Sequence, residues 1–224
     1  MSISDTEICR VTRPKAEAKA SYDKLSRWYD AIVGWSEKRA RETGLQKLVP
    51  AEGETVLEIG FGTGHCIQAL AQSVGTSGKA HGLDLSEGMR DITQERLNRA
   101  GLSDRVELRC GDAANLPYES HTLDAVFTSF TLELFDTPEI PIVLRECYRA
   151  LRPDGRICVV SLSKEQQTRV SKAYEWLHRK IPNYADCRPI FVRRALEDAG
   201  FHIVDVTQMA RWGFLVEIVL AKKP

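Results

Sequence analysis

Three glycines on alternate positions follow an apolar run in the segment VLEIGFGTG. Such a run, residues 55–59, predicts a buried strand that turns sharply into a helix. Because glycine has no Cβ and tolerates positive φ, a loop containing Gly60, Gly62 and Gly64 can lie flat against a ligand. A second apolar stretch (HGLDLSEGM) reaches Asp84 twenty residues after the last glycine, where a carboxylate could accept both hydroxyls of a ribose. The pattern indicates a nucleoside-cofactor site or, without a ligand, a tight strand-to-helix turn.

The spacing of these glycines separates two candidate cofactors. A dinucleotide fold requires G-x-G-x-x-G, whose third glycine allows the helix to pack closely on the strand. His65 occupies that third position, and its imidazole is a steric objection to a dinucleotide. Glu58, inside the apolar strand, would repel a pyrophosphate but could pair with the ammonium or sulfonium of S-adenosylmethionine. The acidic surroundings favour S-adenosylmethionine over a nicotinamide dinucleotide.

Two aspartates could contact the rest of such a cofactor. Asp112 follows the third predicted strand and could accept a hydrogen bond from an adenine amino group, or it could be an ordinary turn residue. Asp84 could likewise be an N-cap or a turn aspartate before Ser86, although Ser86 can cap the next helix itself. Both alternatives stay open from the sequence.

Composition excludes several classes of partner. The chain has 224 residues, which suits one domain with appendages, and 31 basic against 31 acidic residues, so it lacks the basic excess that nucleic-acid binding demands. The basic groups Arg39–Arg41 and Arg193–Arg194 are interpreted as solvated helix faces. No secretory leader or membrane-length apolar run is found, so we expect a cytoplasmic location.

The cysteines indicate no metal site. Six are present, without a CxxC pair or metal-ligand spacing, so we expect no metal. The four that lie in apolar patterns are expected to be buried free thiols: Cys66, Cys110, Cys147 and Cys158.

Strands and helices alternate from residue 54 onward, which predicts βαβ units and a parallel sheet. The predicted strands are 55–59, 79–84, 105–110, 123–129 and 155–162, and the predicted helices are 64–74, 86–100 and 138–151. Residues 152–155 (RPDG) are predicted to form a turn before the fifth strand. A helix at 190–200 and a hairpin of strands at 201–209 and 213–221 complete the prediction, with Arg188 either beginning that helix or contacting an acidic headgroup.

We expect a single domain at residues 21–224, preceded by a loosely ordered segment at 1–20. The parts of this domain are lid helices at 21–50, a cofactor-binding core at 54–163, a substrate-side insert at 164–188, and a C-terminal helix and hairpin at 189–224.

Five segments together resemble the class I S-adenosylmethionine-dependent methyltransferases: VLEIGFGTG, HGLDLSEGM, RCGDAANLPYES, LDAVFTSFTL and RALRPDGRI. They occur in the family's order over roughly residues 55–163. The resemblance implies a Rossmann-like, doubly wound α/β fold whose seven-stranded, mainly parallel sheet has an antiparallel last strand, with N-terminal lid helices. It implies that the methionyl part of the cofactor lies over the three glycines and that its ribose lies at Asp84. The other cofactor-binding residues that it implies are Leu85 and Met89 beside the adenosine, Asp112 and Ala113 at the adenine, and Thr128 and Ser129 near the sulfonium.

Within that class the chain resembles the ubiquinone/menaquinone-biosynthesis methyltransferases and the bacterial phosphatidylethanolamine N-methyltransferases. The resemblance is carried by SYDKLSRWYDAIVG and LPYES, and it implies that Tyr22 and Tyr29 lie at a lid over the cofactor, unless they are helix-packing residues. Two segments depart from the quinone-type pattern: WSEKRARETGLQKL replaces a basic, His-containing signature, and FTSFTLELF replaces an Arg-Asn pair. The acceptor therefore stays open between a quinone precursor, a phospholipid amine and an aromatic metabolite.

Methyl transfer needs an aligned donor and acceptor, and carbon or oxygen acceptors usually need a base as well. The candidates for such a catalytic group are Glu133, His178, Tyr184 and Arg211, each of which could instead be structural. His65 is expected to be structural or adjacent to the cofactor. A catalytically silent S-adenosylmethionine-binding partner or regulatory protein would carry the same cofactor site. The expected partner is a small or lipid-like acceptor, with peripheral membrane contact possible and the oligomeric state unknown.

Overall fold

The computed structural model describes residues 11, 35–165, 188–211 and 213–224. Within this part of the chain, seven strands form one sheet in the order β3-β2-β1-β4-β5-β7-β6. The strands are β1 (Thr55–Ile59), β2 (Lys79–Asp84), β3 (Val106–Cys110), β4 (Leu123–Ser129), β5 (Leu151–Ser163), β6 (His202–Arg211) and β7 (Phe214–Lys222). Strand β7 is antiparallel to both of its neighbours, and the remaining pairs are parallel. The predicted doubly wound α/β sheet with a reversed last strand is confirmed.

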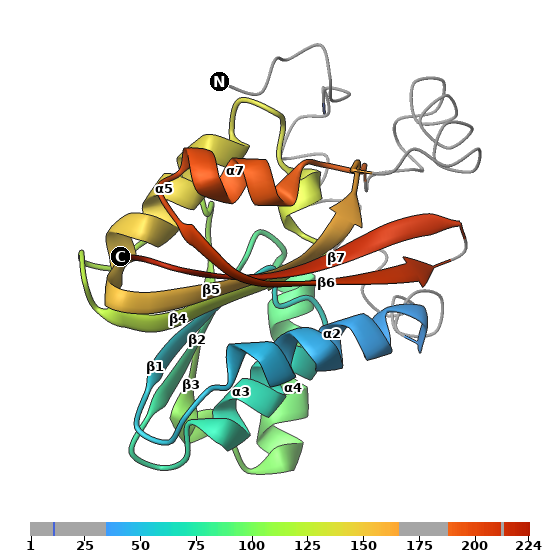
Figure 1. Cartoon of the computed structure of the whole chain (residues 1–224). Helices are drawn as coiled ribbons and strands as arrows, with labels where there is room; N and C mark the ends of the chain where they lie inside the picture. The colour runs from blue at the N-terminus through green and yellow to red at the C-terminus, as the bar shows by residue number, and fades with distance from the viewer. Residues whose placement is uncertain (1–10, 12–34, 166–187, 212) are drawn as a thin grey trace.

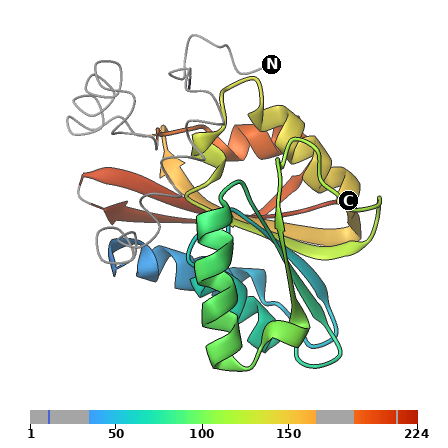
Figure 2. The same ribbon diagram turned by 180° about the vertical axis from the view of Figure 1, so that it is seen from behind.

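Helices cover both faces of this sheet, as Figures 1 and 2 show from opposite sides. One face carries α2 (Trp35–Leu48), α3 (His65–Ser73) and α4 (Glu87–Ala100), and the other carries α5 (Ile140–Ala150) and α7 (Val192–Asp198). Short 3-10 turns precede β3 (η2, Ser103–Arg105) and follow β4 (η3, Leu132–Leu134). Since successive strand residues point to opposite faces, Val56 packs into one apolar cluster and Leu57 into the other. The core is therefore a pair of apolar layers divided by the sheet.

Helix α2 packs closely on the sheet at Gly44. A Cβ atom at Gly44 would lie 2.6 Å from Cγ2 of Val160 and 3.0 Å from Cε2 of Phe127, so a larger residue would push the helix outward. Further along the same helix, Lys47 forms an ion pair with Asp205 of β6. These contacts fix the orientation of α2 and place its first turns at the carboxyl edge of the parallel strands.

Strand β5 begins earlier than the sequence suggested. Leu151 pairs with Leu123 of β4, and the register resumes, after a shift, at the pair of Arg156 with Ala125. The strand therefore does not begin after the turn predicted at 152–155. These residues form an irregular stretch inside β5 that has no partner on β4 and in which Asp154 has a φ of 62°. Strand β6 has a similar register shift, opposite β7 between Ile203 and Asp205.

Three predictions near the C-terminal helix and on the third strand also need correction. Helix α7 is shorter than the predicted 190–200, because Ile190 forms a parallel bridge with Ser163 before the helix begins. Arg188 begins no helix; it is buried and donates to the carbonyl oxygen of Phe135. Cys110 is exposed, because it ends an edge strand, whereas the other three cysteines of the described ranges are buried free thiols as expected. No helix in the described ranges is long and apolar enough to cross a bilayer.

Candidate cofactor site

A cavity opens at the carboxyl ends of β1, β2 and β4. Strands β1 and β4 are neighbours in the sheet, yet the helices that follow them, α3 and α5, lie on opposite faces. This is the topological switch point at which open α/β sheets bind ligands. The cavity wall takes residues from the glycine loop, from the ends of β2 and β4 and from α2.

Two of the three predicted glycines, Gly60 and Gly62, line the floor of this cavity, whereas Gly64 does not. Gly60 has a φ of 73° and donates from its backbone N–H to Leu83 O at 2.7 Å. A Cβ atom there would lie 2.8 Å from the Cβ of Thr131 and closer still to the rest of that side chain. Gly62, with a φ of 50°, has no neighbouring atom within 4 Å of a Cβ built on it, so its backbone faces open space. Gly60 is required by the protein's own packing, whereas Gly62 leaves room for a ligand.

Asp84 joins the glycine loop to the segment after β2. Its Oδ2 accepts from Gly62 N at 3.0 Å, and its Oδ1 accepts from Ser86 N at 3.0 Å. Ser86 is the N-cap of α4, accepting from Met89 N at 3.1 Å, so Asp84 does not cap this helix. Its bond from Ser86 N, two residues on, is that of a turn aspartate, which agrees with the other alternative. A carboxylate has about four acceptor positions, and two backbone donors leave capacity for a ribose diol.

Glu58 is buried in the cavity wall, with 2% of its surface exposed. Its Oε2 has no hydrogen-bond partner among the described residues. Burial raises the pKa of this carboxyl well above its usual range, Arg41 nearby opposes the rise, and Asp84 adds to it. An ionised carboxylate in such a place needs a cationic partner, and the ammonium of a methionyl group supplies one. The residues present therefore fit S-adenosylmethionine, and the contacts of Glu58 with its amino group and of Asp84 with its ribose stay predictions.

Helix α2 contributes two charged residues to the wall, Glu37 and Arg41, whose place there was not predicted from the sequence. Glu37 is 5% exposed and Arg41 Nη1 lies 3.4 Å from its Oε2. Arg39, in the same basic group, is exposed as expected, so the interpretation of Arg39–Arg41 as a solvated face is wrong only for Arg41. Helical spacing is the sequence pattern that could have located these two residues. Glu37 and Arg41 lie one turn apart on the helix face that continues to Gly44 and to the buried Leu48.

Four of the predicted adenosine and sulfonium contacts lie on the cavity wall: Leu85, Met89, Ala113 and Ser129. Thr128 does not, because its side chain points to the opposite face of β4, where it is buried. Asp112 accepts from Ala114 N at 3.0 Å and lines a second, adjoining pocket with Asn115. Its turn geometry matches the simpler alternative, and its contact with adenine stays a prediction.

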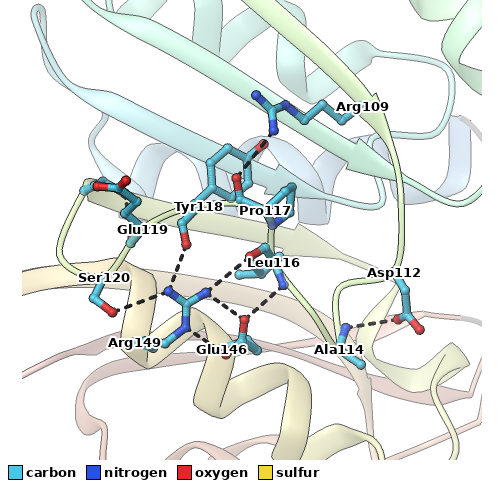
Figure 3. A network of polar contacts seen from close by, with 11 residues as sticks. Arg109, Asp112, Ala114, Leu116, Pro117, Tyr118, Glu119, Ser120, Glu146 and Arg149 are labelled. Atoms are coloured by element: carbon cyan, nitrogen blue, oxygen red, sulfur yellow. Dashed lines mark hydrogen bonds and ion pairs between the residues drawn. The ribbon is translucent and has the colours of Figure 1, made fainter.

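A polar network centred on Arg149 holds the loop after β3 (Figure 3). Arg149, on α5, donates to the carbonyl oxygens of Tyr118 at 2.8 Å and Leu116 at 3.2 Å. It also pairs with Glu146 at 2.7 Å, and Glu146 in turn accepts from Leu116 N at 3.0 Å. These bonds satisfy backbone groups of a segment without regular structure, so the loop that carries Ala113 is fixed to the helix below it.

The remaining sequence candidates are only partly placed. Tyr22, Tyr29, His178 and Tyr184 lie outside the described residues. Arg211 ends β6 at the hairpin, and its side chain is likewise outside the described part. His65 begins α3 on the cavity wall, with Nε2 3.2 Å from Arg96 Nη2. In the part of the chain that the structure describes, no three His, Cys, Asp or Glu side chains gather as a metal site.

Glu133 lies beneath the cavity wall instead of on it. Its side chain is fully buried in η3, and its Oε1 accepts from Leu162 N at 3.3 Å. Burial raises the pKa of this carboxyl to about 7, although hydrogen bonds from backbone amides and from Ser161 oppose the rise. The nearby charge of Glu37 raises it further. The structure therefore does not bring Glu133 to the surface where an acceptor would bind.

This raised pKa predicts a pH-dependent stability. An unfolded glutamate titrates near pH 4.3, so between about pH 4.3 and 7 the folded state holds the proton of Glu133 more tightly. Stability from this residue is present below that window and decreases as pH rises through it, by on the order of 3 kcal/mol. Urea unfolding measures the free energy of unfolding of Glu133→Gln and of the wild type at pH 5 and pH 8. We expect the difference between them to shift in favour of Glu133→Gln at pH 8. Glu119→Gln, at an exposed site, is the control; equal pH dependence in wild type and Glu133→Gln would contradict the assignment.

Comparison with known proteins identifies the family. Residues 56–155 match the family described as Methyltransferase domain. A demethylmenaquinone methyltransferase of Geobacillus sp. is 30% identical over 71% of this chain and 69% of that enzyme. One from Lactobacillus johnsonii is 32% identical over 68% of this chain, which spans 59% of that enzyme's length.

A solved structure supports the fold over nearly the whole chain. The crystal structure of the [4+2]-cyclase SpnF has a TM-score of 0.79 at 18% identity, covering 96% of this chain and 97% of SpnF. At that identity the likeness shows the fold alone. The sequence relatives carry the further step: this chain belongs to the class I S-adenosylmethionine-dependent methyltransferases.

Proposed function

We propose that the protein transfers a methyl group from S-adenosylmethionine to a small lipophilic acceptor, with a reduced quinone-type ring as the first candidate. The observation that carries the proposal is Phe130, which follows β4 directly and lines the cavity. Its φ of 49° is strained for a bulky residue, and its backbone N–H donates to Val160 O at 2.8 Å. Strain that the surrounding structure maintains at a cavity wall supports a functional role for this ring.

The wall next to Phe130 is also apolar. Leu134 and Phe135 line the same cavity, immediately after the strand that contributes Ser129. A planar aromatic acceptor would pack against such a surface and displace water from it. The relatives named as demethylmenaquinone methyltransferases support an acceptor of this kind.

The proposed role of the protein is mainly to orient the two reactants. The cofactor supplies an activated methyl group on its sulfonium. Glu58 would bind the amino group of the cofactor and Asp84 its ribose, and Gly62 would leave space for it. Phe130 with Phe135 would hold the acceptor and exclude water. A base would have to remove the hydroxyl proton of the acceptor. Because Glu133 lies below the wall, the proposed bases are His178 and Tyr184.

A methyl-transfer assay tests this function. Labelled S-adenosylmethionine is offered with a reduced demethylnaphthoquinone, with phosphatidylethanolamine vesicles, or with small catechols and amines. We expect transfer to the reduced naphthoquinone, and we expect Phe130→Ala to lower kcat/KM by roughly 10- to 100-fold, as for loss of a buried aromatic contact. Ile142→Ala, at an exposed apolar site on α5, is the control.

Two outcomes of this assay would contradict the proposal. Methyl transfer only to phosphatidylethanolamine or to amines would show that the acceptor is an amine and not a quinone-type ring. Binding of S-adenosylmethionine without transfer to any acceptor would favour a catalytically silent binding protein.

A further inference from the structure

We infer that Arg41 binds the carboxylate of the cofactor's amino acid group and thereby makes the site selective for the intact methionyl zwitterion. The inference rests on the proposed use of S-adenosylmethionine. It concerns a helix that precedes the matched methyltransferase domain at residues 56–155.

The position of Arg41 supports this role. Its side chain is 14% exposed and lines the same cavity as Glu58 and Gly60. The close packing of Gly44 on the sheet fixes the part of α2 that carries it. Arg41 is therefore a cation held at the cavity by the fold, unlike Arg39, which is exposed on the same helix.

The charges around Arg41 match a zwitterion. Glu37 and Arg41 form an ion pair, and the cationic side chain also acts electrostatically on Glu58 across the wall. A free amino acid group carries one ammonium and one carboxylate on the same carbon. Glu58, whose Oε2 is without a hydrogen-bond partner in the described structure, would take the ammonium, and Arg41 would take the carboxylate. A guanidinium offers five N–H donors in a planar fork, so pairing with Glu37 is compatible with binding a second carboxylate.

The alternative is that Arg41 serves only as a counter-ion for the two glutamates. A buried carboxylate of the ligand would then lie among acidic residues without a cationic partner, which is costly. The two roles differ in what they predict for ligands. A counter-ion affects every ligand of the site alike, whereas a carboxylate-binding residue affects only ligands that carry a carboxylate.

Calorimetric binding of two ligands to matched variants tests the inference. The ligands are S-adenosylmethionine and decarboxylated S-adenosylmethionine, which lacks only the carboxylate. We expect Arg41→Gln to weaken S-adenosylmethionine binding by roughly 10- to 100-fold and to leave the decarboxylated ligand within about threefold, as for loss of one charged hydrogen-bond pair. Arg41→Lys should be intermediate, because an ammonium cannot bind a carboxylate in the bidentate mode. Arg39→Gln should match the wild type.

The possible results separate the inference from the proposed function. The role of Arg41 is overturned if Arg41→Gln, with an unchanged melting temperature, loses affinity equally for both ligands or for neither. Arg41→Lys provides the same comparison if Arg41→Gln does not fold. Failure of both ligands to bind the wild type contradicts the cofactor itself. If calorimetry shows the predicted selectivity but the assay shows no methyl transfer to any acceptor, the role of Arg41 is supported and only the proposed transfer is overturned.

Discussion

Gly60→Ala is expected to lower the stability of the protein and to abolish cofactor binding. The added methyl group would overlap Thr131, and alanine would have to adopt a φ of 73°. The strain and the overlap together should cost about 2–5 kcal/mol. Urea unfolding and calorimetric titration with S-adenosylhomocysteine measure the two effects.

Gly62→Ala is the matched comparison for this effect. It also places alanine at a positive φ, 50°, but the new methyl group meets no protein atom within 4 Å. Its stability should fall by only about 1–2 kcal/mol, while the methyl group occupies space on the cavity floor and weakens cofactor binding. If the two variants lose equal stability, the contact between Gly60 and Thr131 does not constrain the loop.

Asp84→Ala is expected to weaken binding of S-adenosylmethionine and S-adenosylhomocysteine by roughly 30- to 1000-fold. Two hydrogen bonds from ribose hydroxyls to a carboxylate would be lost, each a charged hydrogen bond of about 1.5–3 kcal/mol and not fully additive. Asp84→Asn should lose less, because its carbonyl oxygen can still accept from Gly62 or from a hydroxyl. Calorimetry gives both dissociation constants.

A ligand comparison shows whether Asp84 acts through the ribose or only through the loop. The 2′,3′-dideoxy analogue of S-adenosylhomocysteine should bind wild type and Asp84→Ala with similar affinity. A large loss of the dideoxy analogue in Asp84→Ala would show that Asp84 supports the glycine loop, since it accepts from Gly62 N, rather than the ribose.

The central strands were predictable because their limits are set locally. The predicted ranges of β1, β2 and β4 agree with the structure residue for residue. β1 and β4 are mostly apolar, and β2 holds Ala80 and Leu83 between polar residues. Each strand ends before a glycine or at an aspartate or serine, so the sequence contains both the strand and its end. The same local chemistry located Glu58 and Asp84 on the cavity wall.

The failures have a different origin, since they depend on contacts between distant segments. Arg41 is part of a charged helix, and only the packing of Gly44 on β4 and β5 places its side chain at the cavity. Leu151 looks like the end of a helix until it pairs with Leu123. Arg188 lies in a polar segment but is buried against Phe135, 53 residues earlier. Such placements follow from the assembled sheet and leave no local pattern.

The two outer strands of the sheet also affect how the protein behaves toward its own copies. An open sheet exposes unpaired backbone groups along each edge, and these can recruit a strand from another chain. Here β3 is five residues long and carries Glu107 and Arg109, and β6 is kinked by its register shift beside Asp205, which Lys47 of α2 engages. Short length, charge and a bulge all make an edge a poor template. The sheet can therefore remain open at both sides with little tendency toward strand-to-strand aggregation.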